Sequence, residues 1–436
     1  MLRPAKAIPS DSNKLAPADR PAHEWYRFVL SYPPHLVREY LGRFGLNGGT
    51  TVLDPFCGTG TTLVECKKQG VPSVGIEAHP MAHFASVVKT DWSVSGRRLV
   101  ETAQAVADEA LAVLEAQGVV DDAQLWILRD ASVFELRTLP EAAMKILLAN
   151  SISPLPLHKV LVLRDALERH SPPSLRNPLR LALARALVSG ISNLQFGPEV
   201  GIGPLKEDAP VISAWMRYVR AMADDLEVLR QASGAACVVH HADARRMPLA
   251  VEANSIDAVI TSPPYPNEKD YTRTTRLESV ILGIVNSKEE LQALKRQHLL
   301  RSNTRNVYKG DDDHEWVSSQ HEVQRIAREI EERRIEMGKT SGFERLYAKV
   351  TRLYFGGMAK HFSELRPFLR PGARLAYVVG DQASYLRVMI RTGKILGEIA
   401  ETLGYKVESI DLFRTRLATA TREQLREEVV VLRWPG

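Results

Sequence analysis

The stretch TTVLDPFCGTGTTLVECKKQG, residues 50–70, decides the fold. Its pattern predicts a short apolar strand that ends at Asp54, then a glycine loop, then a helix that stops at Gly70. The segment SVGIEAHP at 73–80 predicts a second strand, and a helix over 81–89 follows it. Two successive strand-helix units indicate an α/β fold with parallel strands.

Five more strand-like segments complete the pattern. They are ACVVHHAD at 236–243, SIDAVIT at 255–261, ARLAYVVGD at 373–381, KVESIDLF at 406–413 and EEVVVLRW at 427–434. Strands that alternate with helices predict a doubly wound, mostly parallel sheet of seven strands, covered on both faces. The last two segments have no helix between them, which favours an antiparallel pair at one edge.

The chain divides into regions of different composition. Residues 1–23 hold four prolines and no apolar block, which predicts a flexible N-terminal tail. We expect the α/β domain to comprise 24–95 and 236–436, interrupted by an almost purely helical insertion over 96–235. The charged stretch 266–345 is expected to be a second insertion, within the α/β domain.

Bulk composition is that of a soluble globular protein, with 44% hydrophobic and 25% charged residues in 436. No stretch approaches the roughly 18 apolar residues of a membrane helix. The three cysteines, Cys57, Cys66 and Cys237, lack metal-ligand spacing and suit a reducing compartment, so we expect a cytoplasmic location, no disulfide and no metal site. The acidic DDDHE at 311–315 is expected to be a solvated turn. A net charge of +5 mildly favours a polyanionic partner.

The glycine loop at the end of the first strand predicts a ligand site. Gly58 and Gly60 allow a tight turn and let a ligand approach the backbone closely, beside the carboxylate of Asp54. The third position of the dinucleotide fingerprint is Leu63, and no phosphate-binding lysine follows as in a P-loop. The loop therefore suits a ligand without a pyrophosphate, although a glycine turn that merely joins strand to helix is the alternative.

Two acids end the next predicted strands. Glu77 follows the glycine loop by about twenty residues, a spacing that favours hydrogen bonds to ribose hydroxyls over a solvated loop acid. Asp243 follows the strand at 236–243 and either accepts from an adenine amino group or caps a turn.

The segment TSPPY, residues 261–265, ends the strand at 255–261 with two prolines. Each proline fixes a φ angle, so Ser262 and Tyr265 are expected on a stiff shelf just past the strand. A polyproline-like loop is the competing interpretation.

The glycine loop, Glu77 and TSPPY together resemble the motifs of the S-adenosylmethionine-dependent methyltransferases that act on exocyclic amino groups of DNA bases. The resemblance covers roughly 25–92 and 236–436 and implies the Rossmann-like class I methyltransferase fold. It implies cofactor contacts at Tyr32, Pro33, Asp54, Pro55, Phe56, Gly58, Gly60, Thr61, Glu77 and Asp243, and catalytic roles for Ser262, Pro263, Pro264 and Tyr265.

The resemblance also gives the shelf a chemical purpose. The amine of a flipped base is a poor nucleophile, and acceptors at the Ser262 hydroxyl and the Pro263 carbonyl would draw its lone pair toward the methyl donor, while Tyr265 stacks on the base. Serine before the prolines is commoner in cytosine-N4 enzymes than in adenine-N6 enzymes, so cytosine N4 is favoured. Attack at cytosine C5 is disfavoured because no cysteine follows a proline. The alternatives are adenine N6, guanine N2 in RNA, and a module that binds without catalysis.

The expected partner is double-stranded DNA, with a cognate restriction endonuclease and a homodimer as further expectations. Seven cations lie in or near the charged stretch and are candidate DNA contacts: Arg273, Arg276, Lys295, Arg296, Arg301, Arg305 and Lys309. A solvated surface loop explains the last five equally well. The insertion over 96–235 is expected to serve target recognition, dimerisation or scaffolding.

Overall fold

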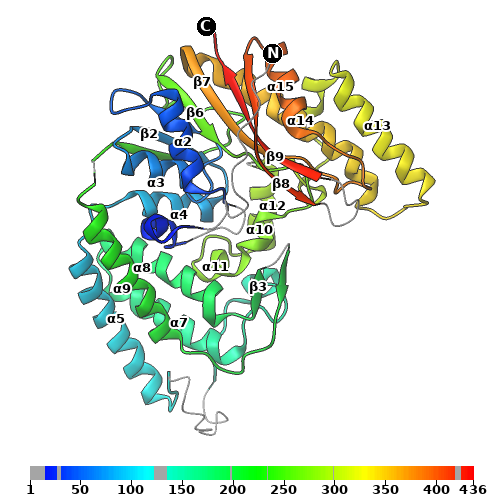
Figure 1. Ribbon diagram of the computed structural model, residues 1–436. Coiled ribbons are helices and arrows are strands. Elements are labelled where there is room, and N and C mark those ends of the chain that lie inside the picture. Colours follow the sequence, from blue (N-terminus) through cyan, green and yellow to red (C-terminus); the bar gives the residue numbers. More distant parts are fainter. Residues whose placement is uncertain are drawn as a thin grey trace.

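The computed structural model describes residues 15–26, 31–121, 135–196, 199–232, 234–297, 299–417 and 424–436. An α/β region built on one large sheet lies beside a mainly helical lobe (Figure 1). Within these residues, no helix is both long and apolar enough to cross a membrane.

The large sheet has seven strands in the order β5-β2-β1-β6-β7-β9-β8. They are β1 Val52–Asp54, β2 Ser73–Glu77, β5 Cys237–His241, β6 Ile256–Thr261, β7 Leu369–Gly380, β8 Lys406–Leu417 and β9 Gln424–Arg433. Pairing is parallel from β5 to β7, and β9 is antiparallel to both β7 and β8. The predicted seven-stranded, mostly parallel sheet is confirmed. Strand β9 lies inside the sheet, between β7 and β8, and β8 forms the edge.

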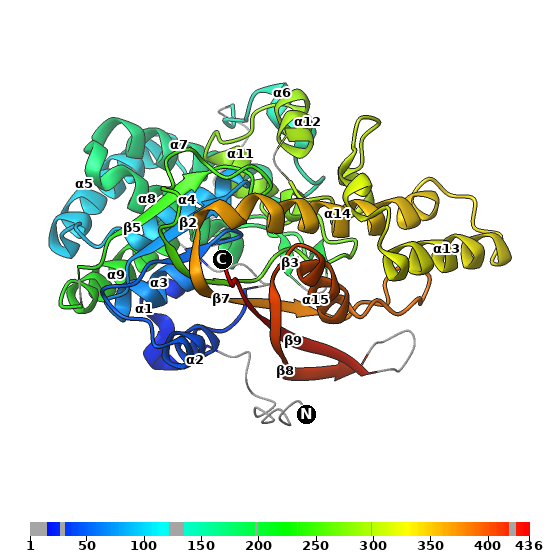
Figure 2. The same cartoon turned by 90° about the horizontal axis from the view of Figure 1, so that it is seen from above.

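Helices cover both faces of the sheet, which is why most residues of its central strands are apolar. Along β7, Leu375, Tyr377 and Val379 belong to one hydrophobic cluster and Ala376 and Val378 to another, as the two-residue period of a strand requires. The helices of this region are α2 Pro34–Phe44, α3 Thr61–Lys68, α4 Pro80–Thr90, α13 His321–Glu336, α14 Tyr347–Leu365 and α15 Thr392–Thr402. In Figure 2, α14 and α15 lie on the side of β7 opposite α2.

The insertion over 96–235 forms the helical lobe and packs on α4 through one continuous cluster of buried residues. Its helices are α5 Gly96–Ala116, α6 Glu141–Ile146, α7 Pro154–His170, α8 Pro173–Ala186 and α9 Val211–Leu229, with a π-helical turn at Leu187–Ile191. The prediction was of an almost purely helical region, and the structure adds one short feature to it. Strands β3 Leu194–Phe196 and β4 Val200–Ile202 form an antiparallel hairpin within it. They were missed because each is only three residues long.

The expected N-terminal tail is ordered over its last residues. A 3-10 turn at Pro17–Asp19 leads into α1 Arg20–His23, and Ala22 is fully buried. The His23 ring shares a hydrogen bond of 2.7 Å with Glu65 of α3. The Trp25 indole donates to Asp225 of α9 over 2.7 Å. This corrects the assignment of 1–23, because polar partners on two regions anchor the part from residue 17 onward; residues 1–14 lie outside the described residues.

The charged stretch 266–345 is not one insertion but two differently packed parts. The first part holds α10 Tyr271–Thr274, α11 Arg276–Ile281 and α12 Lys288–Gln297, and its apolar residues join the core of the helical lobe. The second part holds short turns and α13, whose apolar stripe packs against α14 in the core of the sheet. The DDDHE turn is also not fully solvated, since Asp313 is buried and pairs with Arg245.

Candidate active site

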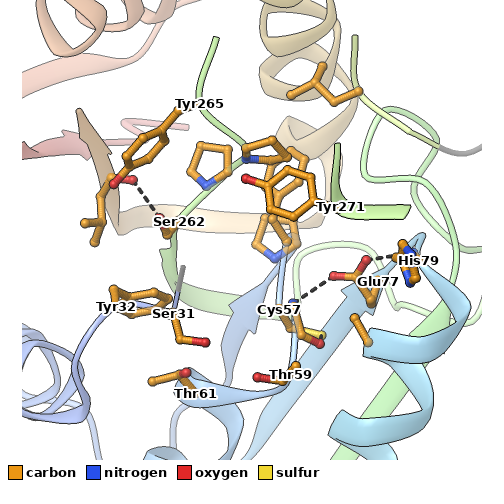
Figure 3. A pocket seen from close by; sticks show the side chains of 18 of the residues that line it. Ser31, Tyr32, Cys57, Thr59, Thr61, Glu77, His79, Ser262, Tyr265 and Tyr271 are labelled. Atoms are coloured by element: carbon orange, nitrogen blue, oxygen red, sulfur yellow. Dashed lines mark hydrogen bonds between the residues drawn. The ribbon is translucent and has the colours of Figure 1, made fainter. Parts of the chain in front are cut away.

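A cavity of about 240 Å³ lies at the carboxyl ends of the parallel strands, where open α/β sheets bind ligands. It joins the glycine loop, the two strand-end acids and the proline shelf. Its lining is Ser31, Tyr32, Pro33, Pro55, Phe56, Cys57, Gly58, Thr59, Thr61, Glu77, Ala78, His79, Ala82, Asp243, Ala244, Ser262, Pro263, Pro264, Tyr265, Tyr271, Leu299, Leu300, Val378, Phe413, Arg414 and Glu427. Figure 3 shows Glu77 and Thr59 on one side of this space, with Ser262 and Tyr265 across it.

The glycine loop follows β1 and begins α3. Gly58 and Gly60 both have positive φ angles, of 54° and 84°. A Cβ on Gly60 would lie 3.1 Å from the Cβ of Ser86, so the loop also needs glycine for the close approach of α4. A Cβ on Gly58 would meet nothing within 4 Å. Since Gly58 lines the cavity and Gly60 does not, the first glycine keeps the ligand space open and the second lets the loop pack.

Glu77 ends β2 and ties the glycine loop to it. Its two carboxylate oxygens accept backbone N–H bonds from Gly58 and His79, each over 2.7 Å. Burial raises the pKa of Glu77 to about 7, against the opposing effect of these bonds. Each oxygen keeps a second lone pair, so the carboxylate can still accept from a ligand hydroxyl.

Asp54 lies beneath the loop rather than in the cavity wall. It is fully buried and accepts hydrogen bonds from the Thr261 hydroxyl over 2.6 Å and from the Phe56 N–H over 3.2 Å. Burial raises its pKa to about 6. Tyr32 also donates to Asp54, and its hydroxyl contacts Thr62. Asp54 thus links the glycine loop, the shelf strand and the segment before α2, which makes it an organiser of the site.

Asp243 lines the cavity as part of a buried ion-pair chain. Arg245 donates to it through Nη2 over 2.6 Å and reaches Asp313 through Nη1 over 2.5 Å. The pairing fixes the direction of the Asp243 carboxylate. Asp313, seventy residues away along the chain, therefore helps to hold Arg245 and, through it, Asp243 in the cavity wall.

The shelf presents its polar atoms to the cavity. The Ser262 hydroxyl donates to the Val378 carbonyl over 3.0 Å, as drawn in Figure 3. With its hydrogen directed there, the Ser262 oxygen keeps its lone pairs as acceptors, within hydrogen-bonding reach of the Tyr265 hydroxyl as well as of a ligand. Tyr265 packs on Gly380, where an added Cβ would lie 3.0 Å from its ring, and burial raises the pKa of its phenol. The shelf is thus fixed by β7.

The part of the cavity near Glu77 contains a polar atom that lacks a protein partner among the described residues. The Thr59 hydroxyl is buried and makes no hydrogen bond within the described residues, although Thr59 lines the cavity. Buried polar groups are normally paired, so this oxygen can form a hydrogen bond to a ligand in the cavity. Together with the Glu77 carboxylate and the open space at Gly58, it fits a ligand that carries hydroxyl and amino groups. No cluster of metal-ligating side chains exists in the described part of the chain.

The seven candidate DNA contacts differ in exposure. Lys295 and Arg301 are 9% and 4% exposed, and they pair with Asp270 and Asp311. Arg276 donates to the carbonyl of Ile146 in the helical lobe over 3.0 Å. These three side chains therefore hold the interior together, which revises their expected role on the surface.

The other four cations are more accessible. Arg296, Arg305 and Lys309 are exposed, and the Arg273 side chain is half-buried beside the shelf. The guanidinium of Arg296 lies 5.1 Å from the ring centre of Tyr308, and that of Arg305 lies 5.9 Å from the ring centre of Phe343. Of the seven cations predicted to contact DNA, the ones that solvent can reach are therefore Arg273, Arg296, Arg305 and Lys309.

Several lining residues escaped the sequence reasoning. Thr59 and Tyr271 stand within or just after motifs that were singled out, so their neighbourhood was a usable signal. Val378 lies near the end of a predicted strand. Arg414 and Glu427 come from the last strand pair and carried no motif, so nothing local indicated them.

Comparisons with known proteins agree with this geometry. A family model for DNA methylases of the N6/N4 type matches residues 11–86, which include the segment before α2, the glycine loop and Glu77.

Curated relatives match over different lengths. The type II methyltransferase M.BsoBI of Geobacillus stearothermophilus is 24% identical over 94% of this chain and 84% of its own length. The type II methyltransferase M.AvaI of Nostoc sp. is 33% identical over 42% of this chain and 39% of its own length. The type II methyltransferase M.MjaII of Methanocaldococcus jannaschii is 43% identical over 15% of this chain and 12% of its own length.

Proposed function

Because this chain belongs to the DNA amino-methyltransferase family, we propose that it methylates the exocyclic N4 amine of cytosine at a specific sequence in duplex DNA. S-adenosylmethionine would supply the methyl group as an electrophilic sulfonium carbon. The observation that carries the proposal is the Ser262 hydroxyl, which lies on the shelf across one cavity from Gly58 and Glu77.

Ser262 supports the chemistry through the direction of its own hydrogen bond. Its donation to Val378 leaves acceptor lone pairs for the N–H groups of a base. The Pro263 carbonyl is a second acceptor on the same shelf, since a proline has a carbonyl but no backbone N–H. Two acceptors on one amine favour its pyramidal form and aim its lone pair at the methyl donor.

Tyr265 supports the base-flipping part of the proposal. An amine inside a duplex is paired, so the base must leave the stack at a cost of a few kcal/mol. Stacking on an aromatic face offsets roughly 1–3 kcal/mol of that cost. The packing of Tyr265 against Gly380 holds the ring at the cavity wall before the base arrives.

The opposite end of the cavity would hold the cofactor. Glu77 would accept from the ribose hydroxyls and Asp243 from the adenine amine, while Thr59 would bind a polar group of the methionine end. Tyr32 and Pro33 line that end of the wall with Pro55, Phe56 and Thr61.

The DNA would contact the accessible cations. Arg305 and Lys309 lie on the segment that follows α12, and Arg273 lies on α10 directly after the shelf. Phosphate contacts by such side chains position a duplex without reading its sequence. The relatives are type II methyltransferases. We propose that this chain has a restriction endonuclease as its partner, and that the two enzymes recognise the same DNA sequence.

The test is Ser262→Ala, with Ser255→Ala as a matched control just before β6. We expect Ser262→Ala to lower the rate of methyl transfer to unmethylated plasmid DNA by about 100-fold, since one preorganised contact to the reacting group is lost. Cofactor affinity, measured by calorimetry, should stay within about threefold of wild type, because Ser262 lies on the base side. Ser255→Ala should leave both quantities unchanged.

The product identifies the base. Digestion of the methylated DNA to nucleosides should give N4-methyldeoxycytidine. N6-methyldeoxyadenosine as the sole product would replace cytosine by adenine, and transfer to structured RNA but not DNA would replace the substrate class. Cofactor binding without any transfer would favour a binding module.

A further inference from the structure

The β8–β9 ladder is irregular where it borders the cavity. Leu412 pairs with Glu428 and Arg414 pairs with Glu427, so Phe413 is an extra residue on β8. Consecutive residues of a regular strand point to opposite faces, whereas a bulge re-aims the side chains around it. Phe413 and Arg414 both line the cavity. The bulge therefore allows a cation and its neighbouring aromatic ring to share one wall.

Arg414 is held in this wall by a buried carboxylate. Its Nε donates to Glu427 over 2.5 Å, and the Glu427 side chain is 10% exposed. A Cβ on Gly380 would lie 3.0 Å from the Tyr265 ring and 3.3 Å from Cγ of Glu427, so the ion pair stands beside the shelf tyrosine. The cation is thus at the base end of the cavity.

The chemistry of a flipped cytosine calls for donors at this end. Its Watson–Crick edge carries the N4 amine, then the acceptors N3 and O2. Ser262 and Pro263 offer acceptors to the amine, so N3 and O2 need N–H groups from another wall. Among the described residues that line the cavity, Arg414 is the one side chain with a permanent positive charge.

We propose that Arg414 reads the N3 and O2 acceptors of the target cytosine and that Glu427 orients the guanidinium for this contact. A guanidinium is a planar fork of five donors, so it can hold a carboxylate along one edge and two adjacent acceptors along another. Adenine offers N1 beside its amine but a C–H group at the next position. Arg414 is then a specificity residue that selects cytosine over adenine, and Glu427 is a positioning residue.

This inference rests on the proposed function, and its test separates the two. Wild type, Arg414→Leu, Arg414→Lys and Arg416→Leu are each incubated with unmethylated plasmid DNA and tritiated S-adenosylmethionine. The methylated nucleosides are then separated and counted. Arg416 is the control because it lies two residues away and also pairs with Glu427, over 3.5 Å, but does not line the cavity.

We expect Arg414→Leu to form N4-methyldeoxycytidine 10- to 100-fold more slowly than wild type, in line with the worth of one bidentate base contact. The share of N6-methyldeoxyadenosine in its residual product should rise. Arg414→Lys should recover part of the rate, because lysine keeps the charge but not the fork. Arg416→Leu should stay within about threefold of wild type, and all variants should bind the cofactor as wild type does.

The outcomes are distinguishable. Wild-type protein that transfers no methyl to DNA overturns the proposed function itself. Wild-type protein that makes N4-methyldeoxycytidine, together with an Arg414→Leu variant of unchanged rate and product ratio, overturns this inference alone. An equal loss in Arg416→Leu also overturns it, because the effect would then come from charge near Glu427. If Arg414→Leu does not fold, Arg414→Lys supplies the test. A wild-type rate of methyl transfer and a wild-type ratio of the two methylated nucleosides in that variant would overturn the inference, because lysine lacks the planar guanidinium.

Discussion

The two ends of the cavity are built on different principles. At the end that we propose to hold the cofactor, backbone groups fix the glycine loop, with the N–H of Gly58 and of His79 bonded to Glu77. At the end that we propose to hold the base, side chains from separate strands meet, and Tyr265 stands beside the Arg414–Glu427 pair. A backbone-built site tolerates little added volume, whereas a side-chain-built site can change its chemistry by substitution. On the proposed function, this difference would let one cofactor end serve different target bases.

The sharpest way to break this comparison is Gly60→Ala. The added Cβ lies 3.1 Å from the Cβ of Ser86, and the loop requires the alanine to adopt a positive φ of 84°. We expect about 3 kcal/mol of lost stability, from left-handed strain and overpacking together, and no measurable cofactor binding. Thermal unfolding and calorimetry give the two readouts.

Gly118→Ala is the matched control for that variant. Gly118 also has a positive φ, of 73°, but an added Cβ there meets nothing within 4 Å. Its cost should be strain alone, about 1 kcal/mol. Equal losses in the two variants would mean that the contact with Ser86 contributes nothing.

A second way to sharpen the comparison uses the pKa of Glu77. Burial raises this pKa to about 7, and ribose hydroxyls are best accepted by the ionised form. Cofactor affinity should therefore fall about tenfold from pH 8 to pH 6, as protonation competes with binding. Titration calorimetry over this range measures it.

Glu77→Gln is the control, because it should bind weakly and without this pH dependence. The effect on folding has the opposite sign. The pKa is higher in the folded state than in the unfolded state, so the Glu77 contribution to the free energy of unfolding decreases as pH rises from about 4.5 to 7. A pH dependence of binding that persists in Glu77→Gln would assign the titration to another group, such as Asp54, whose pKa is about 6.

The smallest expected effect concerns Arg305, an exposed cation outside the cavity. Arg305→Ala should weaken DNA binding a few-fold and lower the slope of log affinity against log salt by about 0.9, with unchanged stability. Lys295→Ala should instead cost roughly 3 kcal/mol of stability, because it leaves Asp270 buried without its cation. Fluorescence anisotropy at several salt concentrations checks the first variant, and thermal unfolding checks the second. A salt slope changed by Lys295→Ala and not by Arg305→Ala would reverse the assignment.

Most of the fold was predictable because its signals are local. The alternation of apolar strands with helices gave the sheet, and the missing helix before 427–434 indicated the antiparallel pair. The placement of β9 inside the sheet was not predictable, because strand order depends on contacts far apart in sequence. The short hairpin β3–β4 and the 3-10 turn at Pro17–Asp19 escaped for a related reason, since three-residue elements carry almost no periodicity.

The site was predictable where motifs carry their own geometry. Gly58, Glu77 and Ser262 each follow a strand end, and the structure brings them to one cavity. Arg414 and Glu427 could not be found this way, because a register shift in a strand pair places them there. The burial of Lys295 was equally hidden, since its partner Asp270 lies twenty-five residues away along the chain.

The segment 17–26, which contains α1, has a mechanical consequence. It lies between the two lobes of the molecule, with His23 bonded to α3 and Trp25 bonded to α9. A motion that separates the lobes must break these two hydrogen bonds as well as the buried contacts between α4 and the helical lobe. The angle between the lobes is therefore restrained in part by a handful of residues near the start of the described chain.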